Sequence, residues 1–119
     1  VKPVMADALE ICETFADGEL DLIVSNPPYI KSADIETLQK EVRLEPRLAL
    51  DGGEDGYDFY REIVSRWSRK LKKGGALAFE LGENQADAVK ALMTDKGFSD
   101  FKISLDFGGV QRAIIGTLL

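Results

Sequence analysis

The feature that most constrains this chain is an apolar run, Leu20 to Ser25, which ends at the tetrapeptide Asn26-Pro27-Pro28-Tyr29. The run has the length and composition of a buried strand. Two consecutive prolines end it, because proline has no N–H to donate to a strand ladder. A rigid polar turn after a strand lies at the carboxyl edge of the sheet, where open α/β sheets bind ligands.

The turn offers two neighbouring hydrogen-bond acceptors, the side-chain carbonyl of Asn26 and the main-chain carbonyl of Pro27. Such a pair suits a planar NH2 group, which presents two hydrogens in one plane. Holding both hydrogens leaves the nitrogen lone pair facing an electrophile. Asn-Pro is also an ordinary turn signal, so a purely structural turn is the alternative interpretation.

The rest of the chain alternates between strand and helix patterns. The clearest helix has one apolar stripe from Tyr60 to Leu71, and Asp7 is expected to cap a short helix near the start. A further helix should run from Ser32 or Asp34 to Pro46, and another between Asn84 and Gly97. Strands are expected at 4–6, 20–25, 76–81, 101–107 and 113–118.

This order predicts an α/β fold with a mostly parallel sheet. The last two strands flank Gly108-Gly109, so an antiparallel β-hairpin should close the sheet. The chain has 119 residues, enough for one domain with its own core.

Composition narrows the classes of function. The formal net charge of −6 argues against a broad nucleic-acid footprint, and no apolar stretch approaches the ~18 residues of a membrane span. Histidine is absent, which removes the commonest general base and metal ligand. Cys12 is the one cysteine, and we expect no signal peptide, so we expect a cytoplasmic protein in a reducing compartment.

The tetrapeptide resembles the motif of S-adenosylmethionine-dependent methyltransferases that modify exocyclic or amide nitrogens. Later segments narrow the resemblance to the HemK/PrmC family, the protein-(glutamine-N5) methyltransferases acting on peptide chain release factors. The resemblance runs from about Asp7 to the C-terminus. Its segments are Glu45-Pro46, Ala49-Leu50, Gly52-Gly53, Asp55-Gly56, Phe59-Tyr60-Arg61, Gly82 with Gln85, and Asp106 with Gly109 and Arg112.

This resemblance implies a Rossmann-like domain of which residues 1–119 form the C-terminal part, beginning at its third strand. Its fourth, fifth, seventh and sixth strands would lie side by side in that order. The Gly-rich cofactor turn does not occur in this sequence, since its Gly-Gly pairs do not follow an apolar strand with G-x-G spacing. The opening Val1-Lys2-Pro3-Val4 is typical of the interior of a longer chain, so we expect a partial catalytic domain that also lacks the family's N-terminal helical domain.

The resemblance also implies roles for particular residues. Asn26 would bind the substrate amide hydrogens and lie near the methionine part of S-adenosyl-L-methionine. In the same substrate-binding turn, Pro27 would offer a carbonyl acceptor and Pro28 would fix the turn. Tyr29 would pack on the planar amide, or serve the core alone. Asp7 and Ala8 would contact the adenine, with helix capping as a second role for Asp7. Glu45 and Pro46 would shape a substrate loop or be purely structural.

The implied reaction transfers a methyl group to a glutamine side-chain nitrogen of a release factor, the expected partner. The alternatives are an exocyclic-amine methyltransferase of DNA or RNA, and a half-domain that binds no cofactor. Asp51, Asp55 and Asp58 match no metal-binding loop and predict a solvated acidic loop. Without a first strand beside it, the strand at 20–25 should be an exposed apolar edge through which the chain associates with itself.

Overall fold

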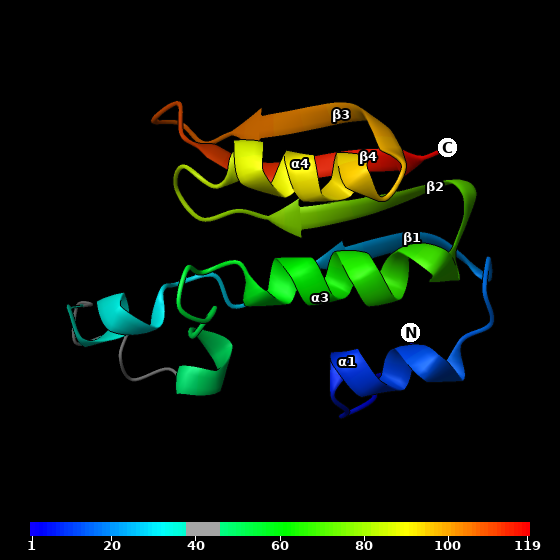
Figure 1. The fold of residues 1–119 in the computed structure, drawn as a ribbon, viewed down its shortest axis with the longest axis horizontal. Helices are drawn as coiled ribbons and strands as arrows, with labels where there is room; N and C mark the ends of the chain where they lie inside the picture. Colours follow the sequence, from blue (N-terminus) through cyan, green and yellow to red (C-terminus); the bar gives the residue numbers. More distant parts are fainter. Residues whose placement is uncertain (38–45) are drawn as a thin grey trace.

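The computed structural model describes residues 1–37 and 46–119 (Figure 1). Within these residues the structure has four strands and three α-helices, with short 3-10 helices between them. The strands are β1 (Leu20–Ser25), β2 (Leu71–Glu80), β3 (Phe98–Leu105) and β4 (Gln111–Leu118). The helices are α1 (Ala8–Ile11), α3 (Asp58–Trp67) and α4 (Ala86–Asp95), and the 3-10 helices are η1 (Cys12–Thr14), η2 (Ser32–Thr37), η3 (Arg47–Ala49) and η4 (Ser68–Lys70).

The strands form one sheet in the order β1-β2-β4-β3. β1 and β2 are parallel, and β4 is antiparallel to both β2 and β3. Three of the four strands therefore point the same way, with β4 inserted against them as the closing hairpin predicts. The expected fold class and the expected order of the fourth to seventh family strands are confirmed.

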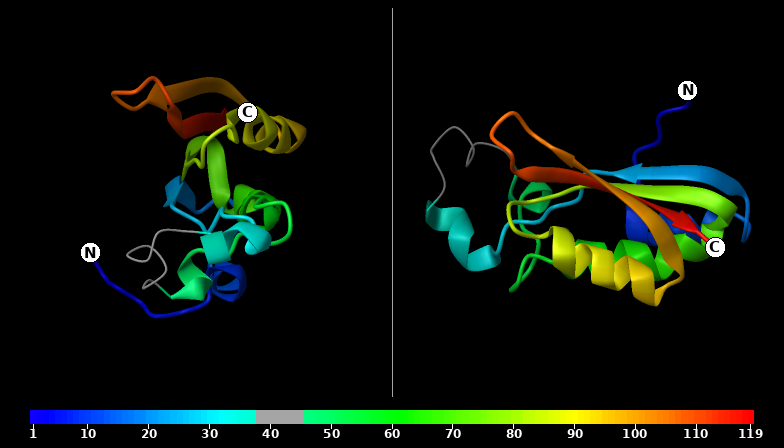
Figure 2. Two further views of the ribbon diagram at one scale, coloured as in Figure 1. Left: turned by 90° about the vertical axis from the view of Figure 1, so that its left-hand side faces the viewer. Right: turned by 90° about the horizontal axis from the view of Figure 1, so that it is seen from above.

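The core lies between the sheet and the helices α3 and α4, which share one face of the sheet (Figure 2). Alternate residues of β2, such as Leu77 and Phe79, point into this core and are buried. Tyr60 of α3 is also buried, and its ring meets Phe79 edge-on, with the ring centroids 5.1 Å apart. By contrast, Leu22 and Val24 of β1 are 55% and 70% exposed. No helix in the described part of the chain is long and apolar enough to cross a membrane.

Three sequence expectations need correction. Residues 4–6 form no strand: β1 is the first strand of the sheet, and Met5 is fully exposed. The helix whose apolar stripe was expected to reach Leu71 ends at Trp67, and Leu71 is the first residue of β2. The helix expected from Ser32 or Asp34 begins as the 3-10 helix η2, and its remainder, with Glu45, falls outside the described residues.

Candidate active site

The tetrapeptide lies where β1 ends, at the carboxyl edge of the sheet (Figure 1). All four of its residues line one pocket of about 260 Å³. Asn26 is exposed and Pro27 buried, while Pro28 and Tyr29 are half-buried. The structure therefore brings together the residues that the sequence predicts for substrate binding. The other lining residues are Ile30, Ala49, Leu50 and Glu80.

The loop after η3 closes tightly onto the motif. Ile30 and Asp51 form an isolated parallel bridge, in which Ile30 N–H donates to the Leu50 carbonyl and Gly52 N–H donates to the Ile30 carbonyl. A Cβ at Gly52 would lie 2.7 Å from Tyr29 Cα and 2.9 Å from the Pro28 carbonyl oxygen. Because these contacts are with backbone atoms, only glycine permits this approach.

Gln85 ties the motif to the turn that follows β2. Its side chain is buried, and its Nε2 donates to the Tyr29 carbonyl at 3.0 Å. Its Oε1 accepts from Gly82 N–H at 2.8 Å and lies 3.2 Å from the Tyr60 hydroxyl. Gly82 itself has no room for a side chain, since a Cβ would lie 2.8 Å from Tyr29 Cδ1. The position of Tyr29 is therefore fixed from two sides, by Gly52 and by the Gln85–Gly82 pair.

Tyr29 and Glu80 face each other in the pocket. The Tyr29 hydroxyl donates to Glu80 Oε1 at 3.4 Å, which is long for an O–H···O bond. Burial, and then the negative charge of Glu80, raises the pKa of Tyr29. Tyr60 donates to the Glu80 main-chain carbonyl at 2.7 Å, and burial raises its pKa strongly. Both phenols therefore stay protonated at neutral pH.

A second pocket, of about 570 Å³, adjoins the motif. It contains Asp7 and Ala8 at the start of α1 together with Asn26, the residues that the sequence predicts for cofactor binding. Asp7 caps α1 as expected, because its Oδ1 accepts from Leu9 N–H at 2.9 Å. Phe59 is added to this pocket by the structure. The full lining is Met5, Ala6, Asp7, Ala8, Leu9, Asn26, Pro28, Ala49 and Phe59.

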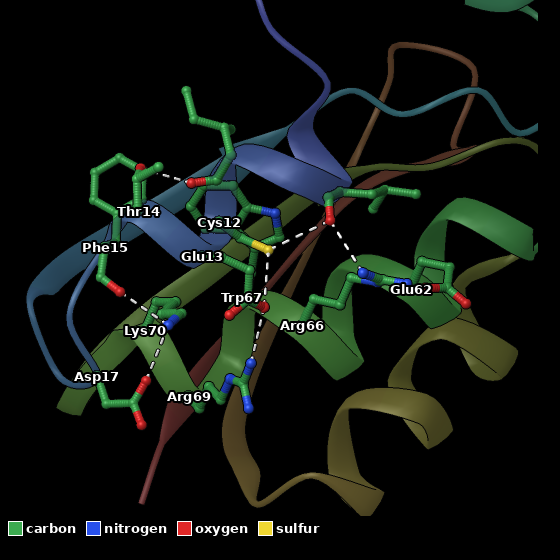
Figure 3. A network of polar contacts seen from close by, with 12 residues as sticks. Cys12, Glu13, Thr14, Phe15, Asp17, Glu62, Arg66, Trp67, Arg69 and Lys70 are labelled. Carbon is green, nitrogen blue, oxygen red and sulfur yellow. Dashed lines mark hydrogen bonds and ion pairs between the residues drawn. The ribbon is translucent and has the colours of Figure 1, made fainter.

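Side chains from α3 and η4 bind carbonyl oxygens of α1 and of Phe15, the residue after η1 (Figure 3). Trp67 Nε1 donates to the Ala8 carbonyl at 2.9 Å, and Arg66 Nη1 donates to the Leu9 carbonyl at 3.1 Å. Lys70 is buried, and its Nζ donates to the Phe15 carbonyl and to Asp17 Oδ1. The end of α3, through Arg66 and Trp67, thus positions α1, the short helix that begins at Ala8 after its cap Asp7.

The acidic loop uses its carboxylates to hold itself together. Asp51 Oδ1 accepts from Ser32 Oγ and Gly53 N–H, and these bonds lower its pKa. Asp55 accepts from Arg61 and from the Tyr57 N–H, which lowers its pKa as well. Asp51 and Asp55 thus stabilise the loop that closes onto the motif, while Asp58 begins α3, where its Oδ1 accepts from Arg61 Nη1 at 3.1 Å.

Sequence reasoning missed Glu80 and Phe59 as lining residues. In the sequence analysis, Phe59 was named only within a segment of the family resemblance, and Glu80 was not named as a site residue. Glu80 could have been found from the strand order, because β1 and β2 are parallel neighbours with Ser25 opposite Phe79. The residue after Phe79 must then lie beside Asn26 at the same edge.

Comparisons with known proteins show what the chain as a whole is similar to. No family model matches the chain. The chain is 50% identical over 107 residues to a release factor glutamine methyltransferase of Geobacter sulfurreducens. The aligned residues make up 89% of this chain and 38% of that protein. The homologous enzyme of Caulobacter vibrioides is 47% identical over 97 residues, covering 81% of the chain and 34% of the relative. The chain thus spans between a third and two fifths of the length of these curated relatives.

Solved structures show the same fold. A release-factor-specific protein-(glutamine-N5) methyltransferase of Alicyclobacillus acidocaldarius matches 92% of this chain, 54% of its own, with a TM-score of 0.55 and 28% identity. The match to a SAM-dependent methyltransferase of Archaeoglobus fulgidus covers 96% of this chain and 66% of that chain, with a TM-score of 0.58. At 16% sequence identity, this likeness concerns the fold alone. By its sequence and its fold, this chain matches a part of the release factor glutamine methyltransferases.

Proposed function

We propose that this chain forms the substrate-binding part of an S-adenosyl-L-methionine-dependent methyltransferase that modifies a glutamine side-chain nitrogen in a peptide chain release factor. The observation that carries the proposal is the motif pocket, in which all four tetrapeptide residues meet at the carboxyl edge. Relatives named for this reaction are up to 50% identical to the chain.

The pocket at α1 suits the adenine end of the cofactor. Its lining is largely apolar, with the Asp7 carboxylate at the helix start, and one Asp7 oxygen already accepts from Leu9 N–H. The other oxygen can accept from an exocyclic amine, and first-turn N–H groups such as that of Ala8 lack an intrahelical partner. Asn26 lines both pockets and would face the methionine end. The bound cofactor would supply an electrophilic methyl group on a sulfonium.

The motif would act by orienting a poor nucleophile. An amide nitrogen has a delocalised lone pair, so it attacks only when its hydrogens are held and the lone pair points at the methyl group. Asn26 and Pro27 would accept these hydrogens, and the Tyr29 ring would pack on the amide plane. Such groups accelerate a reaction when their interactions strengthen in the transition state. The rigid attachment of Tyr29 to Gln85 and Gly52 supports this role, since small misplacements of reacting groups are costly.

An exocyclic amine of a flipped nucleic-acid base is the second candidate substrate, because it offers the same NH2 geometry. The solved structures include a DNA modification methylase of Thermus thermophilus, but at 17% identity this likeness concerns the fold alone. The formal net charge of −6 and the named relatives favour a protein substrate.

The test is methyl transfer to a release factor and to a methylatable DNA or RNA, measured with labelled cofactor. The chain should be assayed alone and extended upstream through the Gly-rich turn that the resemblance implies. Asn26→Ala should lower turnover by about 100-fold or more with the fold intact, as removal of an oriented polar group does. Near-normal turnover of Asn26→Ala would refute the role of the motif, and methylation of nucleic acid alone would refute the substrate.

We also propose that the chain, taken alone, is a partial catalytic domain that self-associates through β1. In the described part of the sheet, β1 is an edge strand, and its Leu22 and Val24 are exposed. An unpaired apolar edge favours pairing with a second chain. Sedimentation at high concentration should show a dimer that Val24→Lys weakens. Leu105→Lys on the opposite edge strand is the matched control, and a monomer at all concentrations would contradict the proposal.

A further inference from the structure

Glu80 lies beside Asn26 without a role in the function proposed above. It is the last residue of β2, and the parallel pairing of Ser25 with Phe79 makes Asn26 and Glu80 the next residues along two adjacent strands. Glu80 lines the motif pocket, and it is exposed, so both substrate and solvent can reach its carboxylate.

Among the described residues that line the motif pocket, Glu80 has the only carboxylate. Its backbone is held by the Tyr60 hydroxyl, which donates to its carbonyl at 2.7 Å. The carboxylate itself has one long hydrogen bond, from the Tyr29 hydroxyl at 3.4 Å. The residue is thus fixed in position while its side chain keeps the capacity to accept a further hydrogen bond or a proton.

Methylation of an amide nitrogen requires a proton acceptor. The nitrogen lone pair forms the new N–C bond as the S–C bond breaks, and the electrons of that bond stay on sulfur as a neutral thioether. The methylated nitrogen then carries one proton too many. The carbonyl oxygens of Asn26 and Pro27 are too weakly basic to take it, and the sequence contains no histidine. Tyr29 cannot take it either, because its hydroxyl stays protonated.

We propose that Glu80 accepts this proton and passes it to solvent. The inference depends on the proposed glutamine methylation and adds a proton acceptor to it. A carboxylate suffices, since the nitrogen becomes strongly acidic as the new N–C bond forms, and its proton moves to the carboxylate during methyl transfer. The sulfonium and the carboxylate are charged before the reaction, and the thioether and the carboxylic acid are neutral after it, so the charges balance.

The first test compares Glu80→Gln with wild type in the active enzyme, extended upstream if necessary. Glu80→Gln keeps the size and the acceptor for Tyr29 but cannot take a proton. We expect kcat to fall about 100-fold with a nearly unchanged KM, as is typical for loss of a general base. Glu80→Asp should retain part of the activity, and Glu83→Gln, a nearby exposed carboxylate, should behave as wild type.

The second test needs no turnover. In a spectrophotometric titration, Glu80→Gln should lower the pKa of Tyr29, since the charge of Glu80 helps to raise it, whereas Glu83→Gln should not. Tyr29→Phe identifies the signal of that residue. Wild-type kcat in Glu80→Gln, or a higher KM with unchanged kcat, would overturn the proton-acceptor role while leaving glutamine methylation intact. If wild type methylates no glutamine, the proposed function fails and this inference fails with it.

Discussion

Replacing Gln85 with leucine tests how the motif is held. The Gln85 side chain donates to the Tyr29 carbonyl, 56 positions away, at 3.0 Å and accepts from the Gly82 N–H at 2.8 Å. Leucine has a similar size but neither donor nor acceptor. Gln85→Leu therefore leaves one main-chain carbonyl and one main-chain N–H without a partner at a buried position.

The expected cost follows from these two groups. Each buried polar group left unpaired costs about 1–3 kcal/mol, so the pair costs about 2–6 kcal/mol. Burying an apolar side chain in place of the amide offsets about 1.5 kcal/mol. We expect the free energy of unfolding to fall by about 0.5–4.5 kcal/mol, compared with the ~5–15 kcal/mol of a typical domain.

Urea denaturation followed by circular dichroism measures this change, with the slope of the transition checking that the folded state is otherwise intact. Gln85→Glu separates the two bonds, because it keeps the acceptor for Gly82 and loses the donor to Tyr29. Glu83→Leu, in the same turn but exposed, is the matched control and should change stability by less than ~0.5 kcal/mol. A Gln85→Leu protein as stable as this control would refute the view that Gln85 anchors the motif.

Two further predictions concern the same region. Gly52→Ala should lower the melting temperature more than Gly18→Ala, because a Cβ at Gly52 meets the Tyr29 backbone at 2.7 Å whereas Gly18, at φ +71°, faces open space; equal shifts would contradict the close approach. Stability should also fall as the pH rises above about 10, since the folded state raises the pKa of Tyr29 and Tyr60 and so binds their protons more tightly than the unfolded chain does. Thermal unfolding between about pH 9 and 11 checks this, and an unchanged melting temperature would count against it.

Local sequence patterns were enough to predict several elements of the fold. The apolar run, the two prolines of the tetrapeptide and the Gly108-Gly109 turn are short-range signals whose effect on the backbone does not depend on the rest of the fold. They predicted β1, the motif turn and the closing hairpin, which the structure confirms. The strand expected at 4–6 was wrong for the opposite reason: a strand exists only when a partner pairs with it, and β1 is an edge of the described sheet.

By itself, then, the sequence determined the fold class, the motif and the family resemblance. The tertiary structure decided which distant residues meet the motif. Glu80 enters the pocket because two parallel strands end together, and Ala8 is held by Trp67, 59 positions away. Such contacts depend on strand register and on the path of the chain between elements, and neither is encoded in the periodicity of any one segment.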